Sequence, residues 1–581
     1  MRHLVGAALR RPFSRPALQR EWEQFRLLSR DSVRRLLDSI LVSRDADPML
    51  FALWFTTLAV TPPTLVAMRK TIQYPFLQKA PLEVIEQIST ADRSFFIVYG
   101  MLATALLASL TWDALFPDRT DQEIVGVLPV RPRTLAAARL AAGMTIGTAF
   151  AAAVNLPAAI IYSLASASHP LLGALPRVLA AHVVTTMMAC ACTFLGLMSL
   201  RALVAICAGE RIADRLALVL QFVTIVLLVE TFLFLPAVLP DIIDAMQEGR
   251  ASYAWVPPVW FVALFIWMAE GTSFLSDHIV KAVAVTAAVT GLIVLVSLPP
   301  AAWMGRRVLE VRTIERASGL ALLARRIALL WVRGPVVRSM FVFGVASLAR
   351  SRRHTILLAT HLGLAIAVGV LKLVPPIVFG TVVLQTPRTY TLAIPLVLMF
   401  FAVFGLRAGF AIPTELDANW VFRLVQPTVR DSVRASRWLI LLLGVVPIAI
   451  VWLPVTLAMW PVQTAIGATL LTLTTGMLVT ELALGNWTKI PFASAHAPAT
   501  DTIKSRWPLY VFGLIVYQFA LPNFQLIALR SWRSTLVQLG IGVALIVAVR
   551  TWRARTLRHR TPTFDVVGSE AITLNLSEAA S

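Results

Sequence analysis

The sequence predicts an all-α polytopic membrane protein with about twelve transmembrane helices, arranged as two six-helix halves. Of the 581 residues, 58% are hydrophobic and only 14% are charged, and a soluble domain of this size could not bury so much apolar surface. About twelve apolar stretches are each long enough to cross a hydrocarbon layer roughly 30 Å thick, which takes about 20 residues. These stretches form two successive sets of six, separated by a basic segment.

The expected spans divide the chain into five parts. In the first half the spans cover about 48–68, 94–115, 140–164, 178–200, 216–239 and 278–303, and in the second half about 355–374, 391–410, 438–460, 462–481, 507–521 and 534–549. The five parts are a cytoplasmic amphipathic N-terminal segment (1–47), a first transmembrane half (48–303), a cytoplasmic linker with a second surface helix (304–353), a second transmembrane half (354–550), and a cytoplasmic tail that we expect to be disordered (551–581).

The distribution of the 52 lysine and arginine residues sets the expected orientation. With the N-terminus in the cytoplasm, forty lie in cytoplasmic segments and nine in outer loops, while Lys281, Lys372 and Arg407 lie within spans. This is the positive-inside bias expected of correctly threaded spans in a cell (inner) membrane, and it places both termini and the linker in the cytoplasm. The net charge of +21 therefore indicates topology and attraction to membrane lipids, and we expect no nucleic-acid partner.

A basic amphipathic segment precedes the first span of each half. Within 20–41, the residues Trp22, Phe25 and Leu36 recur at helical spacing among five arginines, and the segment 338–353 has a similar pattern. Such helices are expected to lie along the inner membrane surface. The alternative is a cytoplasmic helix that packs on other protein.

The cytoplasmic loop between the second and third spans has the same layout in both halves: a proline, acidic residues, a short apolar-faced helix, a second proline and then arginines. Pro117 and Pro413 fit a first helical turn, where the missing N–H costs nothing. Leu416, Trp420 and Leu424 follow at four-residue steps, which gives the predicted helix an apolar stripe with a charged rim. Such a surface suits docking of a cytoplasmic partner, and an interfacial connector without a partner is the alternative.

Taken together, the stretch LFPD…LPVRPRTLAAARL, the surface helix before each first span and the six spans per half resemble the permease of an ABC-2-type ABC transporter. The resemblance covers nearly the whole chain twice, as an internal duplication. It implies that 118–128 and 415–425 are coupling helices for ATPase subunits, and that 20–41 and 338–353 are elbow helices. The implied contact residues are Asp118, Asp121, Glu123, Ile124, Leu128, Glu415, Asp417, Trp420 and Arg423.

The resemblance also bears on a short apolar segment between the fifth and sixth spans. Residues 254–269 are too few to cross a membrane, and Pro257 and Pro258 interrupt them. Family members carry a re-entrant helical hairpin at this place, entering from the outer side. In the second half only FALPNFQLIALRSW precedes the last span, so any hairpin there is expected to be shorter.

Nucleotide binding is not expected in this chain. The sequence contains no GxxxxGK[ST] phosphate loop and no Gly-Lys dipeptide, so phosphate groups have no cradle of that type. We therefore expect a permease that is not itself an enzyme and binds no cofactor. Two separate ABC ATPase subunits would hold ATP and magnesium.

Ionisable residues within spans are candidates for function because burying them is costly. Glu230, His182, His361 and Glu481 are the residues concerned. Glu230 is the candidate pathway residue, which would contact a polar substrate group or gate the route. An interhelical hydrogen bond is the alternative interpretation of its position.

Two other classes of protein remain open from the sequence. An ion- or proton-coupled secondary transporter also has twelve spans, and it would place charged pairs deep within them. A membrane-embedded enzyme acting on a lipid carrier would need clustered acidic residues or histidines at an interface, for which Asp241, Asp244 and Glu248 are the outer-side candidates. For a transporter, the apolar spans favour a lipid-like or amphipathic substrate.

Overall fold

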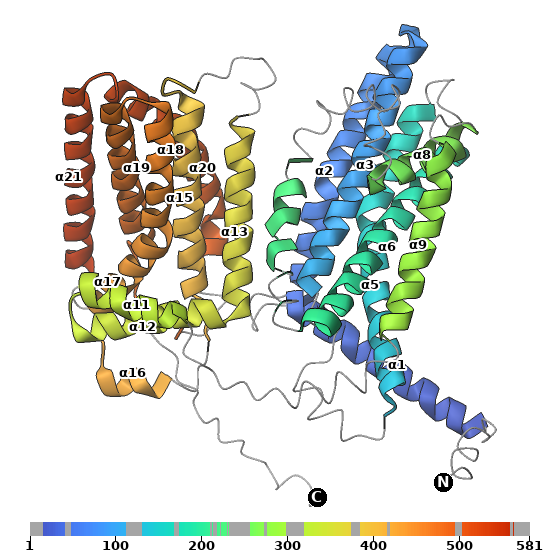
Figure 1. Ribbon diagram of the computed structural model, residues 1–581, viewed down its shortest axis with the longest axis horizontal. Helices are drawn as coiled ribbons and strands as arrows, with labels where there is room; N and C mark the ends of the chain where they lie inside the picture. Colours follow the sequence, from blue (N-terminus) through green and yellow to red (C-terminus); the bar gives the residue numbers. More distant parts are fainter. Residues whose placement is uncertain are drawn as a thin grey trace, which may run out of the picture. The chain divides into compact units, whose positions relative to one another are not determined.

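The computed structural model of the chain is helical (Figure 1). It describes residues 15–40, 48–111, 130–167, 174–209, parts of 212–231, 256–271, 276–297, 319–373, 384–414, 419–493, 502–557 and 562. Within these ranges the regular elements are helices, with no strand, which confirms the predicted all-helical class. A helix satisfies its own backbone hydrogen bonds, so it suits apolar segments that have no water to bond with.

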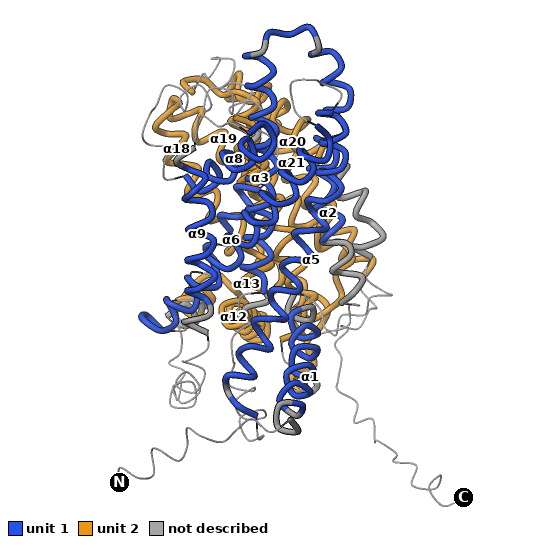
Figure 2. Tube along the Cα trace, turned by 90° about the vertical axis from the view of Figure 1, so that its right-hand side faces the viewer, with its two compact units in different colours: residues 1–314 blue, residues 315–581 orange. Residues whose placement is uncertain are grey.

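The chain separates into two compact units, Met1–Ile314 and Glu315–Ser581, coloured separately in Figure 2. The boundary falls within the predicted linker, and the surface helix before the second half belongs to the second unit. Each unit therefore carries its own amphipathic helix followed by its own set of apolar helices.

Seven described helices are long and apolar enough to cross a membrane, and one bent pair would make an eighth. They are Glu83–Thr111, Arg133–Ala167, Leu175–Ala208, Thr389–Phe410, Val429–Met459, Val462–Ala483 and Trp532–Thr556. This result confirms a helical membrane protein. The predicted number of twelve spans is not reached within the described ranges.

Unit 1 is a bundle built around one central helix. Its helices are α1 (Arg15–Ile40), α2 (Pro48–Phe76), the 3₁₀ turn η2 (Leu77–Lys79), α3 (Leu82–Thr111), α5 (Pro132–Ala167), α6 (Leu175–Ala208), α8 (Pro257–Glu270) and α9 (Ser276–Ser297). The helix α6 contacts α3, α5, α8 and α9. Large aromatic side chains from three of these helices, among them Phe96, Tyr162 and Phe265, fill the core between them.

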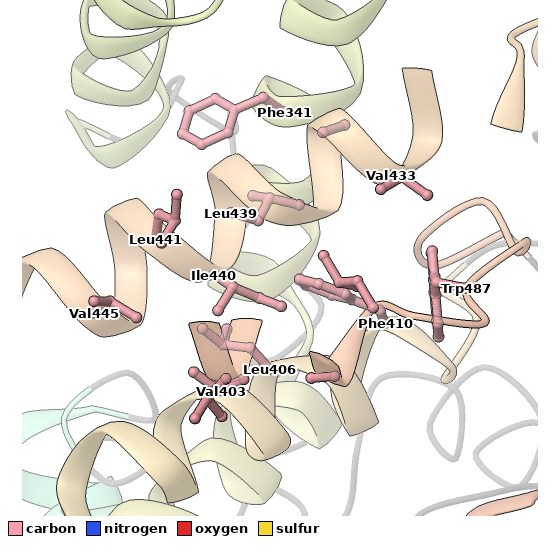
Figure 3. Close-up of a cluster of buried hydrophobic side chains, with 14 of the residues drawn as sticks. Phe341, Val403, Leu406, Phe410, Val433, Leu439, Ile440, Leu441, Val445 and Trp487 are labelled. Atoms are coloured by element: carbon pink, nitrogen blue, oxygen red, sulfur yellow. The ribbon is translucent and has the colours of Figure 1, made fainter. Parts of the chain in front are cut away.

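Unit 2 is arranged around α15. Its elements are α11 (Gly319–Trp331), α12 (Pro335–Arg350), α13 (Arg352–Leu371), α15 (Thr389–Phe410), α16 (Trp420–Val425), α17 (Val429–Ile440), the π-helical turn η6 (Leu441–Val445), α18 (Val446–Met459), α19 (Val462–Ala483), α20 (Thr502–Ala528) and α21 (Trp532–Thr556). Figure 3 shows the core at one end of this unit, where Phe341 of α12 lies over Leu439 of α17 and Leu406 of α15. Burial of such side chains stabilises the packing by about 1.5–3 kcal/mol each.

The amphipathic helices are observed where the sequence predicts them. The helix α12 is bent by 81° from the span that follows it, as expected of a helix that lies along a membrane surface. The helix α1 packs on α5, and its Leu36 is buried, whereas Trp22 is 65% exposed and stacks on Phe25. One end of α1 is therefore packed on protein and the other offers aromatic surface. The amphipathic helix α11 had not been predicted.

The short apolar segment between the fifth and sixth predicted spans forms α8, whose side chains are mostly buried in unit 1, although Trp267 remains exposed. In the second half α20 continues unbroken to Ala528, so no hairpin lies within 502–528. One detail of the prediction is wrong. Pro413 is not helical and α16 begins at Trp420, so Pro413 does not occupy the first turn of that helix.

Close helix approach in unit 2 gives a testable prediction at Gly405. A Cβ atom there would lie 2.9 Å from both Cβ and Cγ of His361 on α13, so α13 and α15 would have to separate. We expect Gly405→Ala to lower the free energy of unfolding by about 1–3 kcal/mol, measured by thermal or denaturant unfolding in detergent. Gly540→Ala on α21 is the control, because its added methyl group meets nothing within 4 Å. Equal stability of the two variants would contradict the prediction.

Candidate functional site

The short helix α16 lies at the end of unit 2 that carries α11, α12 and α17, and it projects beyond them (Figure 1). It follows α15 and precedes α17, so it sits between the second and third spans of the second half. Apolar side chains of this helix face outward: Leu424 is 74% exposed, and Val421 and Val425 are also exposed. A helix with unburied apolar residues at the end of a bundle is suited to contact another protein.

The connection between α16 and the rest of unit 2 is well defined. Asn419 Nδ2 donates to the backbone oxygen of Ala493 at 2.5 Å, which ties the start of α16 to the segment after α19. The ring of Phe422 packs edge-on against Phe343 of α12, with centroids 5.8 Å apart. A groove of about 680 Å³ lies between α12 and α16 and is lined mainly by apolar side chains. Movement of α16 would therefore be passed to α12 and to the end of α19.

The segment before α16 is held by a further set of backbone bonds. His354 of α13 hydrogen-bonds through Nε2 to the Ile412 oxygen at 3.0 Å. The Phe492 amide donates to the Phe410 oxygen at 2.9 Å, and the Thr414 amide donates to the Phe492 oxygen at 3.1 Å. On the other side of α16, Thr428 and Asp431 form a capping box that starts α17. Both flanks of α16 are thus fixed to the bundle.

The predicted contact residues are only partly covered by the structure. Asp118, Asp121, Glu123, Ile124 and Leu128 lie outside the described residues, and so do Glu415 and Asp417. Trp420 and Arg423 belong to α16, where the structure describes their backbone.

A buried charge cluster joins three helices at the same end of unit 2. The Glu481 side chain, 1% exposed, accepts Arg550 Nε at Oε1 (2.7 Å) and Arg553 Nη2 at Oε2 (2.5 Å). Arg437 of α17 lies against the same carboxylate, with Nε 2.7 Å from Oε1 and Nη2 donating to Oε2 at 3.2 Å. The cluster links α17, α19 and α21. Among the residues that the structure describes, one carboxylate thus faces three guanidinium groups, which leaves a formal surplus of two positive charges there.

Unit 1 has a different buried network, at the end of the bundle away from α1. Lys70 Nζ lies 2.6 Å from Asp92 Oδ1, and the Tyr74 hydroxyl donates to Asp92 Oδ2 at 2.9 Å. The hydroxyl groups of Tyr74 and Tyr162 are 3.3 Å apart. These contacts connect α2, α3 and α5 near the ends that the predicted topology places on the outer side.

Arg93 extends this network to α8. Its side chain is 1% exposed, and Nη1 lies 2.6 Å from Oε1 of Glu270, the last residue of α8. The guanidinium carbon also lies 5.1 Å from the ring centroid of Phe265. His182 of α6 is fully buried against the rings of Phe265 and Tyr162, with centroids 5.7 Å away in each case. Arg93 thus holds α8 to α3 through one ion pair and one aromatic contact.

Glu230, the candidate pathway residue, lies in the helical stretch that continues in parts to Thr231. Both of its carboxylate oxygens are shielded from solvent, and neither has a hydrogen-bond partner within the described part of the chain. The alternative of a satisfied interhelical hydrogen bond finds no support among those residues. Glu230 therefore remains a candidate.

Sequence reasoning missed the two clusters for the same reason. Lys70 and Arg93 had been assigned to outer loops, and Arg437, Arg550 and Arg553 to the positive-inside bias, so none was considered as an interior side chain. Each cluster has one feature in the sequence that marks it. In unit 1 it is the pair Asp92 and Arg93 at the start of an apolar run, and in unit 2 it is a single glutamate, Glu481, at the end of a span. Neither feature shows which residues of other helices these side chains meet.

Comparison of the chain with protein-family models, with curated proteins and with solved structures gave no match.

Proposed function

We propose that this chain is the membrane-spanning permease of an ATP-driven ABC exporter, and that two ABC ATPase subunits on separate polypeptides supply the energy. The cytoplasmic helix between the second and third spans of each half would receive their movement. The cargo would be lipid-like or amphipathic and would cross the inner membrane. ATP and magnesium would be held by the partner subunits.

One observation carries this proposal: α16 stands outside the helical bundle, keeps apolar side chains exposed and has both flanks fixed to the bundle. Leu424 is 74% exposed within the chain, so its burial against a partner would be favourable. The anchor from Asn419 to Ala493 gives a route by which a force on α16 reaches α19.

The elbow-like geometry at the start of unit 2 gives further support. The bend of 81° separates α12 from the following span, and the edge-on contact between Phe343 and Phe422 joins α12 to α16. A movement of α16 would therefore reorient α12, and through it α13. Such rigid coupling is what a two-state transport cycle needs.

The test is affinity purification of the tagged full chain from its native membranes. We expect an ABC ATPase to be recovered with the wild-type chain, and Leu424→Asp to lower its recovery about tenfold, because a charge would replace a central apolar contact. The double variant with Ile124→Asp would remove the corresponding contact of the first half.

A matched control is Leu330→Asp on α11, since Leu330 is 81% exposed and lies at the same end of unit 2. Recovery of the ATPase should be unchanged in this variant. A chain that purifies without any ATPase, or equal recovery with Leu424→Asp and Leu330→Asp, would contradict the coupling role of α16.

The buried ion pairs of unit 1 favour a second candidate function, an ion- or proton-coupled secondary transporter. Lys70–Asp92 and Arg93–Glu270 are the kind of interior charged pairs that such proteins use. Against this, Lys70 and Glu270 lie near the ends of α2 and α8, and Asp92 and Arg93 lie about a third of the way along α3. Purified protein in sealed vesicles distinguishes the two: uptake driven by a proton or sodium gradient with no ATPase present would support the second candidate.

A further inference from the structure

The guanidinium groups around Glu481 exceed what its carboxylate can bind. Two carboxylate oxygens offer about four lone-pair positions, and Arg437, Arg550 and Arg553 each donate one hydrogen bond to them. Each arginine carries five N–H donors, so the three supply about fifteen. The donors therefore far outnumber the acceptor positions of the carboxylate, and the cluster keeps both surplus charge and surplus donors.

Much of that surplus lies on Arg550. This residue uses Nε for Glu481, and no hydrogen bond from its two terminal nitrogens is found within the part of the chain that the structure describes. Its side chain is 42% exposed, compared with 6% for Arg553 and 18% for Arg437. The planar outer edge of Arg550, with Nη1 and Nη2, is therefore available to an acceptor that approaches from outside the bundle.

The position of Arg550 along α21 indicates whether its exposed N–H groups face water, lipid headgroups or lipid chains. Trp532 and Trp552 stand near the two ends of this helix, twenty residues apart, which corresponds to about 30 Å at 1.5 Å per residue. That distance equals the thickness of a hydrocarbon layer, and tryptophan favours both of its boundaries. Trp552 is 54% exposed. Arg550, two residues before it, lies about 3 Å inside that boundary, from where a long arginine side chain reaches the level of the lipid headgroups.

The helix α21 is also the least buried span of unit 2. Only 11% of its apolar window is buried, compared with 67% for α15, so most of its surface is free to face lipid chains. An acceptor that reaches Arg550 along this helix therefore belongs to a molecule whose tail lies in the hydrocarbon layer. The formal surplus of two positive charges favours a lipid-like molecule whose polar group is anionic.

We propose that Arg550, with Arg437 and Arg553 held beside it by Glu481, binds the headgroup phosphate of an anionic phospholipid at the surface of α21. A guanidinium group presents two parallel N–H bonds that match a phosphate, and Glu481 fixes the arginine side chains before the lipid arrives. Basic pockets between spans on the cytoplasmic side recognise anionic headgroups in this way. The glutamate positions the arginines, and the arginines bind the phosphate.

A purely structural cluster would not have these features. An ion pair that only holds helices together needs equal numbers of opposite charges. One arginine would neutralise the Glu481 carboxylate, and two would supply its hydrogen bonds. The third guanidinium adds repulsion within the cluster, because all three contact the same carboxylate and like charges so placed cost energy even near a protein surface. A bound phosphate would offset that repulsion, and it would do so at the exposed member, Arg550.

Native mass spectrometry of the purified full chain provides the test. The protein is prepared in mixed micelles that contain either phosphatidylglycerol or phosphatidylcholine. The two samples are compared for the number of lipids retained in the mass spectrum and, in a separate experiment, for the rise in melting temperature. We expect phosphatidylglycerol to be retained preferentially, and Arg550→Gln to weaken its binding about fivefold, the loss of roughly 1 kcal/mol per basic residue. Arg550→Lys keeps the charge but removes the planar fork, so it should also weaken binding.

The control is Arg555→Gln, since Arg555 is exposed in the last turn of α21, five residues beyond Arg550, and is not among the arginines that contact Glu481. Equal losses in Arg550→Gln and Arg555→Gln would mean diffuse attraction and would overturn the site. Inorganic phosphate provides a further arm: if millimolar phosphate stabilises the chain as much as phosphatidylglycerol does, the ligand is a free anion and the lipid assignment fails. Equal retention of the two lipids would also overturn it.

Discussion

Glu481→Gln is expected to lower the stability of unit 2 by about 3–5 kcal/mol, the cost of leaving buried charges without their partner. The substitution keeps the shape of the side chain but removes the only carboxylate that the described residues place against Arg437, Arg550 and Arg553. Chemical or thermal unfolding of the purified chain in a zwitterionic detergent measures the change.

A second substitution separates repulsion from the loss of hydrogen bonds. If mutual repulsion of the arginines dominates, the double variant Glu481→Gln with Arg550→Gln should be more stable than Glu481→Gln alone, since one surplus charge has been removed. Anionic lipid should likewise reduce the loss in Glu481→Gln. A loss below about 1 kcal/mol, typical of a surface ion pair, would contradict our interpretation of the cluster as a buried one.

The second large effect is expected in unit 1, where Glu270→Gln should lower stability by about 3 kcal/mol. The Glu270 side chain is itself 28% exposed, so its own desolvation contributes little. The cost arises at Arg93, which is 1% exposed and would keep a buried charge without a carboxylate. We expect faster proteolysis of the region around α8 together with a lower melting temperature.

Two further variants make this expectation specific. Arg93→Met with Glu270→Gln removes both charges, so it should be more stable than Glu270→Gln alone, because an apolar side chain suits a site next to Phe265. Glu86→Gln on the exposed part of α3 is the control and should change stability by less than about 0.5 kcal/mol. If Glu270→Gln behaves like Glu86→Gln, the ion pair does not hold α8.

The sequence predicted the helices well because a hydrophobic stretch of span length must satisfy its own backbone hydrogen bonds in a membrane, and a helix does so. It predicted their ends less well. The second span was expected from residue 94, whereas α3 begins at Leu82, because a hydropathy pattern stops at charged residues such as Asp92 and Arg93. In the folded unit these charges are neutralised by Lys70 and Glu270, so the helix continues through them.

The candidate site was predictable to a smaller extent. Repetition of a loop pattern in both halves indicated a helix near Trp420, and the structure has one there, although it begins five residues later than the predicted start at 415. The anchor from Asn419 to Ala493 joins residues 74 positions apart, and no local pattern contains such information. The same holds for Arg437 and Arg553, which meet only because α17 and α21 both pack on α19.

The π-helical turn Leu441–Val445 lies within the long helix that runs from α17 into α18. A π-helical turn holds about one residue more than an α-helical turn over nearly the same rotation, so deletion of one residue here would let the segment relax to a regular α-helix with α18 in nearly the same orientation. Trp452 and Thr456 would therefore still face inward. The same deletion within the regular part of α18 would turn every later side chain by about 100°, so this turn is the place where the long helix tolerates a change in its length.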